Sequence, residues 1–479
     1  MSESGRSCVS AALRAAVPAV LCAALAGCMV GPDWRAPRAP AEAAYTPRPV
    51  ALRGASEAVP AQQLLPRAAL PARWWEAFAS PELDATVRRA LADSPTLRQA
   101  RATLLQAREA VVVARGGMLP QLDLQAGATR ARGAPDGPAA ELYSAGPLVG
   151  YAPDVFGGTR RLVEQQQALV DVQREQLEAA RLALSGQTVA QAIAAASARE
   201  QLLAVQRIVE ADRSNLELVR LAQSAGQASG ADVAGAQSQL AADLTLLAPL
   251  RQQLAAARDA LALLVGRGAG AWQAPDFDLR RLRLPRQLPL VVPSALVRAR
   301  PDIRAAEARL HAASAAIGVA SADLYPRLTL SAGWSAESAT LGALFSGGQA
   351  WALSGALAAP LWHGGALRAQ RRAARQAYDA QLALYRQTVL LAFAQVADVL
   401  QALQHDAQLL QAQRDAMAAA EESLRMAREA YAGGAGSVLQ VLAAQRAYAR
   451  ASLGEAQARA QRLADTAQWY TAMGAVPRP

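Results

Sequence analysis

Apolar and polar positions alternate along two short segments of the chain. In the segment 327–336, the even positions are Leu, Leu, Ala, Trp and Ala, whereas the odd positions are Arg, Thr, Ser, Gly and Ser. The segment 121–129 shows the same alternation. A period of two residues predicts a strand with one apolar face. We expect return strands near 142–152 and 350–359, so that each segment forms a hairpin, either in a membrane or on a soluble core.

Two longer segments, 154–248 and 361–476, contain no proline and are dominated by residue types that favour helices. A helix over 366–431 would be about 100 Å long at ~1.5 Å per residue. Glycines near 226–230 and 433–436 predict a turn in each segment, after which a helix of about 30 residues returns. Apolar residues of the second segment are spaced as in a coiled-coil seam, which predicts that the long helices need partners; they are Leu403, Leu409, Leu410, Met417, Leu424 and Met426.

The chain contains an internal repeat. Residues 94–127 align without a gap to residues 300–333, and 14 of the 34 positions are identical. The correspondence continues beyond both hairpins with little drift in register, which argues against a chance match. We therefore expect two copies of one unit, each with a helix, a β-hairpin and long helices. The copies are 80–266 and 293–474, joined by a linker, 267–292, and followed by a tail, 475–479.

The N-terminus has the features of an export signal. Arg6 and Arg14 precede 13 apolar residues, 15–27, a run that is too short to span a bilayer and is typical of a signal peptide, 1–27. The sequence Leu-Ala-Gly-Cys at 25–28 is similar to a bacterial lipobox, which predicts acylation of Cys28. The following segment, 28–79, is rich in proline and is expected to be an extended arm anchored to the lipid bilayer. No cysteine follows Cys28, so no disulfide is possible beyond it.

The hairpins constrain how the chain could cross a membrane. No run of about 18 apolar residues follows the leader, so no transmembrane helix is predicted. Four strands in an open sheet cannot cross a bilayer, because their edges would leave backbone groups unpaired in lipid. Closed membrane barrels have about eight strands or more. The chain is therefore predicted to oligomerise, and three copies would supply about 12 strands.

Charge and composition exclude several classes of function. All 49 basic residues are arginine and the net charge is +10, but acidic residues are interspersed, so nucleic acid is not an expected partner of this exported chain. No lysine is available for a phosphate-binding loop, and no HExxH or GxSxG motif occurs. His311, His363 and His405 are far apart in sequence, and His363 is expected at a strand-to-helix junction. We predict no enzyme activity, no cofactor and no metal site.

Several segments, in their order along the chain, resemble the TolC-like outer membrane factors, and more closely the OprM/NodT-type outer membrane lipoproteins of efflux pumps. The segments are CMVGPDWRAP (28–37), RWWEAFASPELDATVRRALADSPTLRQA (73–100), LYPRLTLSAG (324–333), PLWHGG (360–365) and YAGGAGSVLQVLAAQRAYARASL (431–453). The resemblance implies an α+β membrane protein, a homotrimer whose 12-stranded outer-membrane β-barrel is continued by a long α-helical periplasmic barrel.

The resemblance also implies a function. It points to a passive exit duct in the bacterial outer membrane for small toxic compounds or drugs, with a periplasmic adaptor protein and an inner-membrane pump as partners. A type I protein secretion channel would have the same fold, although the lipobox favours efflux. A lipid-anchored helical scaffold that conducts nothing is a further alternative, but a scaffold has no need of amphipathic hairpins.

In this family the periplasmic end of the channel is closed near the two helical turns. By resemblance, Asp232 takes the acidic position of the first turn and Tyr431 the tyrosine of the second, and a hydrogen bond between carboxylate and phenol would latch the helix ends. Gln440 stands where the family often has aspartate, and Gly436 where some members have arginine, so we expect a gate with less charge. The alternative is that Asp232 caps its helix and Tyr431 only packs.

Overall fold

The computed structural model describes residues 29–38, 44–48, 52, 59, 61–132 and 139–477. The predicted signal peptide and the predicted acylation site, Cys28, lie outside these residues. The chain divides into two compact units, which we describe separately. The described parts of the first, here called the hairpin unit, are 29–38, 102–132, 139–174 and 305–386; those of the second, the core unit, lie within 39–101, 175–304 and 387–477.

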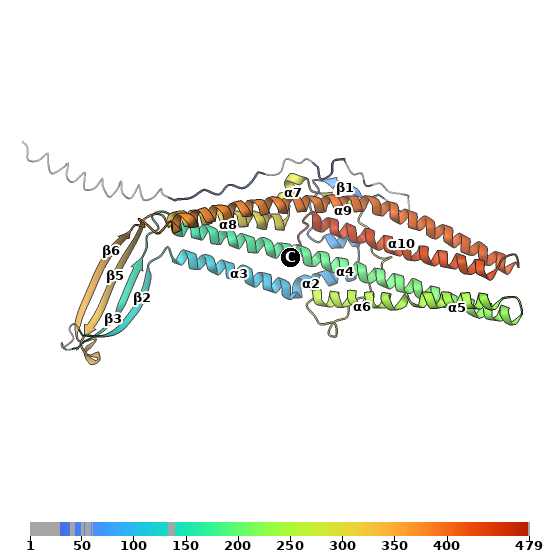
Figure 1. Ribbon diagram of the computed structural model, residues 1–479, viewed down its shortest axis with the longest axis horizontal. Coiled ribbons are helices and arrows are strands. Elements are labelled where there is room, and N and C mark those ends of the chain that lie inside the picture. Colours follow the sequence, from blue (N-terminus) through green and yellow to red (C-terminus); the bar gives the residue numbers. More distant parts are fainter. Residues whose placement is uncertain are drawn as a thin grey trace, which may run out of the picture. The chain divides into compact units, whose positions relative to one another are not determined.

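The hairpin unit contains a four-stranded antiparallel sheet in the order β2-β3-β5-β6 (Figure 1). Both predicted hairpins are present, and pairing of β3 with β5 joins them into one sheet. A short 3₁₀ helix, η2 (Leu341–Ala343), lies between β5 and β6. The strands are β2 (Gln121–Arg132), β3 (Ala139–Tyr151), β5 (Arg327–Ser338) and β6 (Gly348–Ala358).

The pairing register places the apolar positions of all four strands on one face of the sheet. Leu122 pairs with Val149, Val149 with Ala332, and Ala332 with Leu353, so that these side chains form one row across the sheet. The alternate positions, which are mostly polar or small, form the opposite face. The alternation seen along single strands is therefore confirmed for the sheet as a whole.

Each hairpin follows a helix of 22 residues and precedes a helix of 67 residues. The shorter helices, α3 (Pro95–Gly116) and α8 (Pro301–Ala322), begin at a proline, which suits the first helical position because no N–H partner is needed there. The longer helices, α4 (Gly158–Ser224) and α9 (Ala366–Ala432), occupy the segments without proline. Among the described helices, none combines the length and apolar character needed to cross a bilayer.

The helices that return from the turns differ between the two halves of the chain. In the second half, α10 (Val438–Ala472) is continuous over 35 residues. In the first half, the prediction of a single returning helix is wrong, because the chain forms α5 (Gly230–Leu244) and α6 (Leu247–Leu264) instead. Pro249 explains the break, since it cannot donate a hydrogen bond to the carbonyl of Thr245 and its ring crowds that carbonyl.

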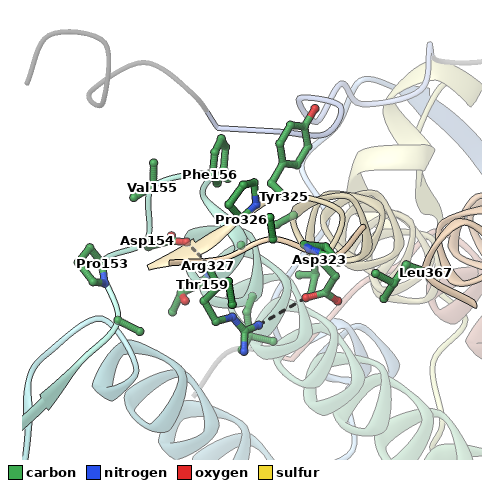
Figure 2. A pocket seen from close by; sticks show the side chains of 18 of the residues that line it. Pro153, Asp154, Val155, Phe156, Thr159, Asp323, Tyr325, Pro326, Arg327 and Leu367 are labelled. Carbon is green, nitrogen blue, oxygen red and sulfur yellow. Dashed lines mark hydrogen bonds and ion pairs between the residues drawn. The ribbon is translucent and has the colours of Figure 1, made fainter. Parts of the chain in front are cut away.

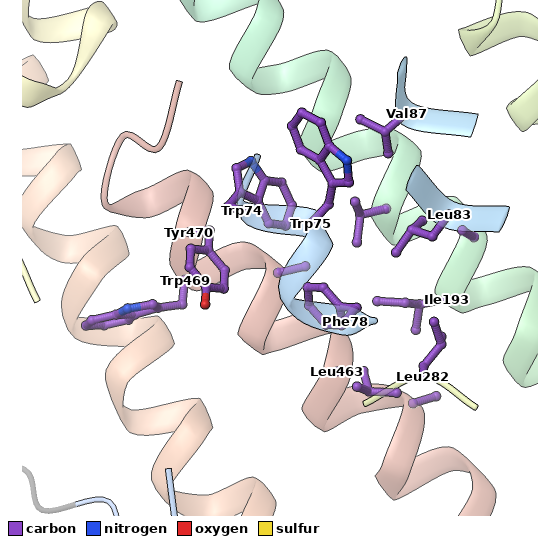
Figure 3. Packing of buried hydrophobic residues seen from close by; sticks show 14 of the residues in the cluster. Trp74, Trp75, Phe78, Leu83, Val87, Ile193, Leu282, Leu463, Trp469 and Tyr470 are labelled. Atoms are coloured by element: carbon purple, nitrogen blue, oxygen red, sulfur yellow. The ribbon is translucent and has the colours of Figure 1, made fainter. Parts of the chain in front are cut away.

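An aromatic cluster lies at the centre of the core unit (Figure 3). Trp74, Trp75 and Phe78, from the 3₁₀ helix η1 (Trp74–Phe78), are at most 2% exposed. The ring of Trp74 stacks on that of Tyr470, with the centroids 5.3 Å apart. Burial of each such side chain contributes roughly 2–3 kcal/mol, so this cluster is a main source of the unit's stability.

The prediction that 28–79 is simply an extended arm is wrong for its second half. β1 (Gln63–Pro66) pairs in parallel with β4 (Gln287–Leu290), and η1 lies in the aromatic cluster. The strand β4 lies near the end of the segment predicted to be a linker, 267–292, so this segment also contains regular structure. Two short strands far apart in sequence form here because each supplies the backbone partner of the other. The remaining helices of the core unit are α2 (Pro81–Asp93) and α7 (Pro293–Ala299).

Candidate functional site

Asp232, the first predicted gate residue, belongs to a capping box at the start of α5. Ser229 is the N-cap, and its Oγ accepts a hydrogen bond from the backbone N–H of Asp232 at 3.2 Å. In return, Oδ2 of Asp232 accepts from the backbone N–H and the hydroxyl of Ser229, both at 2.8 Å. These backbone and side-chain hydrogen bonds lower the pKa of Asp232, so its carboxylate complements the positive end of the helix.

Gln440 occupies the matching position at the start of α10. Oγ of Ser437 accepts from the backbone N–H of Gln440 at 3.3 Å, and Oε1 of Gln440 accepts from the N–H of Ser437 at 3.1 Å. Both turns also contain a glycine in the left-handed region, Gly226 at φ +71° and Gly434 at φ +74°. The two turns are therefore built alike, and they differ in the charge that the capping residue carries.

Tyr431, the third predicted gate residue, lies one position before the end of α9 and is 40% exposed. Among the described residues, the carboxylate of Asp232 is bonded to Ser229, and no hydrogen bond joins it to Tyr431. The capping role that was the alternative for Asp232 is therefore present. The latch stays a prediction, because it would require a contact beyond those of this single chain.

Two pairs of aspartates, which no pattern in the sequence predicts, connect the long helices to the returning helices in the core unit. Asp212 on α4 bonds to Asp243 on α5, and Asp406 on α9 bonds to Asp465 on α10. Asp212 and Asp406 are only 4% and 7% exposed. In both pairs, the aspartate on the returning helix also accepts a hydrogen bond from the glutamine four residues before it, at 2.5 and 2.9 Å.

In each pair, the aspartate on the long helix has a raised pKa. Burial first, and then the neighbouring carboxyl group, raise the pKa of Asp212 and of Asp406 to about 7, while Arg446 and Arg462 oppose the shift. One carboxyl group of each pair can then donate a hydrogen bond to the other. Nothing local in the sequence marks these residues, because each is a single aspartate in a helix until its partner is known.

A hollow of about 640 Å³ lies in the hairpin unit where the strands meet the helices (Figure 2). The carboxylate of Asp154 caps α4 by accepting a hydrogen bond from the backbone N–H of Thr159 at 3.0 Å. Asp323 and Arg327 form an ion pair at 3.7 Å across the start of β5. His363 lines the same hollow, as expected for a residue at this junction. No group of His, Cys, Asp and Glu side chains that could hold a metal ion occurs in the described part of the chain.

Comparisons with known proteins agree with the fold. The family model described as "Outer membrane efflux protein" matches residues 86–267 and again 292–475. The chain is 32% identical to the pyoverdine export outer membrane protein OpmQ of Pseudomonas aeruginosa, with 84% of this chain and 87% of that protein covered. It is 28% identical to the antibiotic efflux pump outer membrane protein ArpC of Pseudomonas putida, with 94% and 93% covered.

A solved structure supports the same assignment. The outer-membrane channel OprN aligns with a TM-score of 0.84 at 27% identity, and the alignment covers 94% of this chain and 100% of that one. The resemblance drawn from the sequence motifs, the mixed helical and sheet fold and the outer-membrane location are thereby confirmed. With its amphipathic sheet, its two 67-residue helices and a family match over most of its length, the chain belongs to the outer membrane efflux protein family.

Proposed function

We propose that the chain is the exit duct of a tripartite efflux system. In this proposal, an inner-membrane pump and a periplasmic adaptor deliver small toxic compounds or drugs to the duct, and the pump supplies the energy. The named relatives support a small-molecule cargo, since one is a pyoverdine export protein and another belongs to an antibiotic efflux pump.

The sheet is the observation that carries the proposal. Its strands are 11 to 13 residues long, close to the length that crosses a bilayer at a tilt. Its apolar face is open, and five of its large side chains, all on the edge strands β2 and β6, are 70–82% exposed in this chain: Leu122, Leu124, Trp351, Leu353 and Leu357. Lipid would cover such a face, because it is continuous and its charged residues, Arg130, Arg132 and Glu141, are confined to the end of β2 and the start of β3.

The edges of the same sheet need partner strands, which further copies of the chain could supply. β2 and β6 stand at its edges, and no described strand pairs with their outer sides. Unpaired edges are not tolerated in lipid, so the edges of neighbouring copies would have to pair. We propose a homotrimer, in which four strands from each copy close a barrel of about 12 strands.

The helical seam supports the trimer independently. Leu403, Leu410 and Leu424 are at most 6% exposed, so the chain's own helices cover this part of the seam. Leu409 and Met426 stay 47% and 52% exposed. A second copy packed along α9 would bury them, as in a barrel of paired helices. The long helices of three copies would then form the periplasmic tube.

We also propose that Cys28 carries the lipid and that Asp232 and Tyr431 form the latch, with Gln440 leaving the second turn without a charge. The capping box does not exhaust the carboxylate of Asp232. An ionised carboxylate has about four acceptor sites, and Ser229 uses two of them. The hydroxyl of an exposed Tyr431 from a neighbouring chain could therefore still bond to it.

The direct test uses the mature protein in detergent. We expect light scattering to give the mass of a trimer, mass spectrometry to find Cys28 acylated, and planar bilayers to record discrete conducting channels. A stable monomer, or trimers that never conduct, would contradict the duct. Leu353→Arg on the apolar face and Ser354→Arg on the opposite face form a matched pair, of which only the first should prevent channel formation.

A further inference from the structure

The residues that follow Cys28 lie against the first turn of α4 in the hairpin unit. The backbone N–H of Val30 donates a hydrogen bond to the carbonyl of Phe156 at 3.1 Å. The carbonyl of Val30 accepts from Nε of Arg161 at 3.2 Å. An extended segment without a strand partner thus finds partners for its backbone groups on a helix and the loop before it.

Arg161 is the centre of this contact. Its side chain is only 2% exposed, and it pairs with Asp33 at 2.8 Å and with Glu164 at 2.7 Å. A buried guanidinium is tolerated only when its charge is paired and its N–H groups are bonded. Removal of the N-terminal segment would take away Asp33 and the carbonyl of Val30, and would leave Glu164 as the remaining partner shown. Arg161 is therefore suited to the docked segment.

Two glycines allow the segment, the arginine and α8 to meet. Gly31 has φ +98°, and a Cβ there would lie 2.5 Å from Cα of Gly318 on α8. A Cβ on Gly318 would lie 2.6 Å from Cγ of Arg161. Glycine inside a helix costs about 1 kcal/mol relative to alanine, and this close approach gives the physical reason for Gly318.

The far end of the segment is held by an aromatic contact. The ring of Trp34 stacks on that of His311, with the centroids 4.8 Å apart. Nε2 of His311 lies 3.0 Å from Oε1 of Glu164, the same carboxylate that pairs with Arg161. One network therefore connects both ends of the segment to α4 and α8.

We propose that residues 29–34 form a docked strap and that Arg161, Gly318 and His311 are its socket, which holds the start of the strap, Met29, at the junction of the sheet and the helices. Met29 packs on Gly157, since a Cβ on that glycine would lie 2.5 Å from Cγ of Met29. Met29, the residue that follows Cys28 in sequence, therefore lies at this junction. The motif CMVGPDW thus has a structural role in Gly31, Asp33 and Trp34, in addition to acylation.

This strap deepens the proposed lipid anchor and rests on it for the function of Cys28. A docked strap keeps the acyl chains beside the amphipathic sheet, which raises their effective concentration at the membrane surface that the sheet enters. A loose arm would spread the same chains over a much larger volume. Arg161 is then a positioning residue for the anchor.

Docking can be measured with a spin label on Arg35→Cys, an exposed position next to the strap. The acylated mature chain has no other free thiol, since Cys8 and Cys22 precede Cys28 in the leader. In the full-length protein in detergent, we expect an immobilised electron paramagnetic resonance spectrum. We expect most of the immobilised component to be lost in Arg161→Ala and in the double variant Asp33→Ala, Trp34→Ala.

Arg174→Ala is the matched control, because Arg174 is 51% exposed on the same helix and pairs with Asp171 instead of the strap. Its spectrum should equal that of the parent. Arg161→Ala could also disturb the fold of α4. The double variant tests the strap without this risk, because both of its substitutions lie outside the helices. A mobile label in the parent, or an unchanged spectrum in the double variant, would overturn the strap.

Mass spectrometry of the same samples separates the two proposals. If Cys28 proves not to be acylated, the label is placed on Arg35→Cys in a chain whose other cysteines are replaced by serine. An immobilised label there would support the strap and remove the lipid anchor. An acylated Cys28 with a mobile label would support the anchor and overturn the strap.

Discussion

At the level of single residues, the two helical turns show how one local device accommodates two different side chains. Asp232 and Gln440 each accept a hydrogen bond from the N–H of a serine N-cap and so complete a capping box. The capping geometry needs only an acceptor at this position, so it does not distinguish a carboxylate from an amide. Capping alone therefore does not explain why residue 232 carries a charge. The charge of Asp232 is available for a second contact.

The latch predicts a specific effect of Tyr431→Phe. This substitution removes only the phenolic hydroxyl, so the hydrogen bond to Asp232 of a neighbouring chain is lost while packing is kept. We expect the open probability of single channels in planar bilayers to rise several-fold. Asp232→Ala should raise it at least as much, because it removes the acceptor.

Ser229→Ala separates the latch from the cap. It removes the hydroxyl of the N-cap but keeps both the carboxylate and the phenol. We expect faster hydrogen exchange at the start of α5 and little change in conductance. If Ser229→Ala opens the channel and Tyr431→Phe does not, the cap controls the gate and the latch is wrong.

At the level of helices and strands, the aspartate pairs connect each long helix to the helix that returns beside it. The pKa of Asp212 and of Asp406 is raised to about 7 by burial and by Asp243 and Asp465, whereas an aspartate in the unfolded chain titrates near 3.9. The folded chain therefore holds protons that the unfolded chain releases. The free energy of unfolding should fall as the pH rises from about 4 to about 7.

Because the free energy of unfolding falls as the pH rises, we predict that Asp212→Asn and Asp406→Asn stabilise the protein at high pH. Asparagine keeps the shape and donates a hydrogen bond without ionising. We expect each variant to raise the free energy of unfolding by about 1–2 kcal/mol at pH 8 and to change it little at pH 4. Thermal melts followed by circular dichroism at both pH values measure the difference. Asp171→Asn, at a half-exposed site of α4, is the control, and an equal gain at both pH values would argue against a raised pKa of Asp212 and Asp406.

The assignment of the two faces of the sheet can be tested with neighbouring residues of β6. Leu353 lies on the apolar face and Ser354 on the opposite face, where its hydroxyl is 2.7 Å from that of Ser331. Leu353→Arg should cost about 2–4 kcal/mol if it faces the middle of a bilayer. We expect it to reduce the folded protein in outer-membrane fractions, and Ser354→Arg to have little effect. Equal losses would mean that the faces are assigned incorrectly.

At the level of the whole molecule, one chain leaves both the edges of its sheet and part of its helical seam uncovered. Leu409 stays 47% exposed on α9 although its neighbour in the seam, Leu410, is 4% exposed. The proposed assembly of identical copies would account for both features, because each copy would supply the edge and the seam contact that the next one lacks.

An assembly of this kind predicts that Leu409→Glu shifts the detergent-solubilised protein from trimer toward monomer. The glutamate would place a charge in an apolar contact between copies, which is unfavourable without a partner. Native mass spectrometry gives the ratio of the two species. Gln408→Glu, at the adjacent exposed position, should leave the trimer intact. A trimer that tolerates Leu409→Glu would exclude this part of α9 from the contact.

Local sequence was sufficient to locate the two hairpins, the two long helices and the turns between helices. These features depend on the period of apolar residues and on proline and glycine, which act within a few residues of their own position. The apolar seam of α9 was predicted in the same way. Which of its residues are covered within the chain, and which stay exposed, was not predicted. Leu410 and Leu409 are adjacent in sequence, and only the packing of α9 shows which of them is covered within the chain.

The other features of the fold and of the candidate sites depend on contacts between segments that are distant in sequence. Three such contacts are the pairing of β1 with β4, the contact between Asp212 and Asp243, and the ion pair of Asp33 with Arg161. In each of them, nothing in the sequence around one residue indicates its partner. The physical reason is that a hydrogen bond or an ion pair depends on which atoms lie within about 3 Å in the fold. Sequence period encodes the face that a side chain occupies, whereas the partner it meets there depends on how the faces pack.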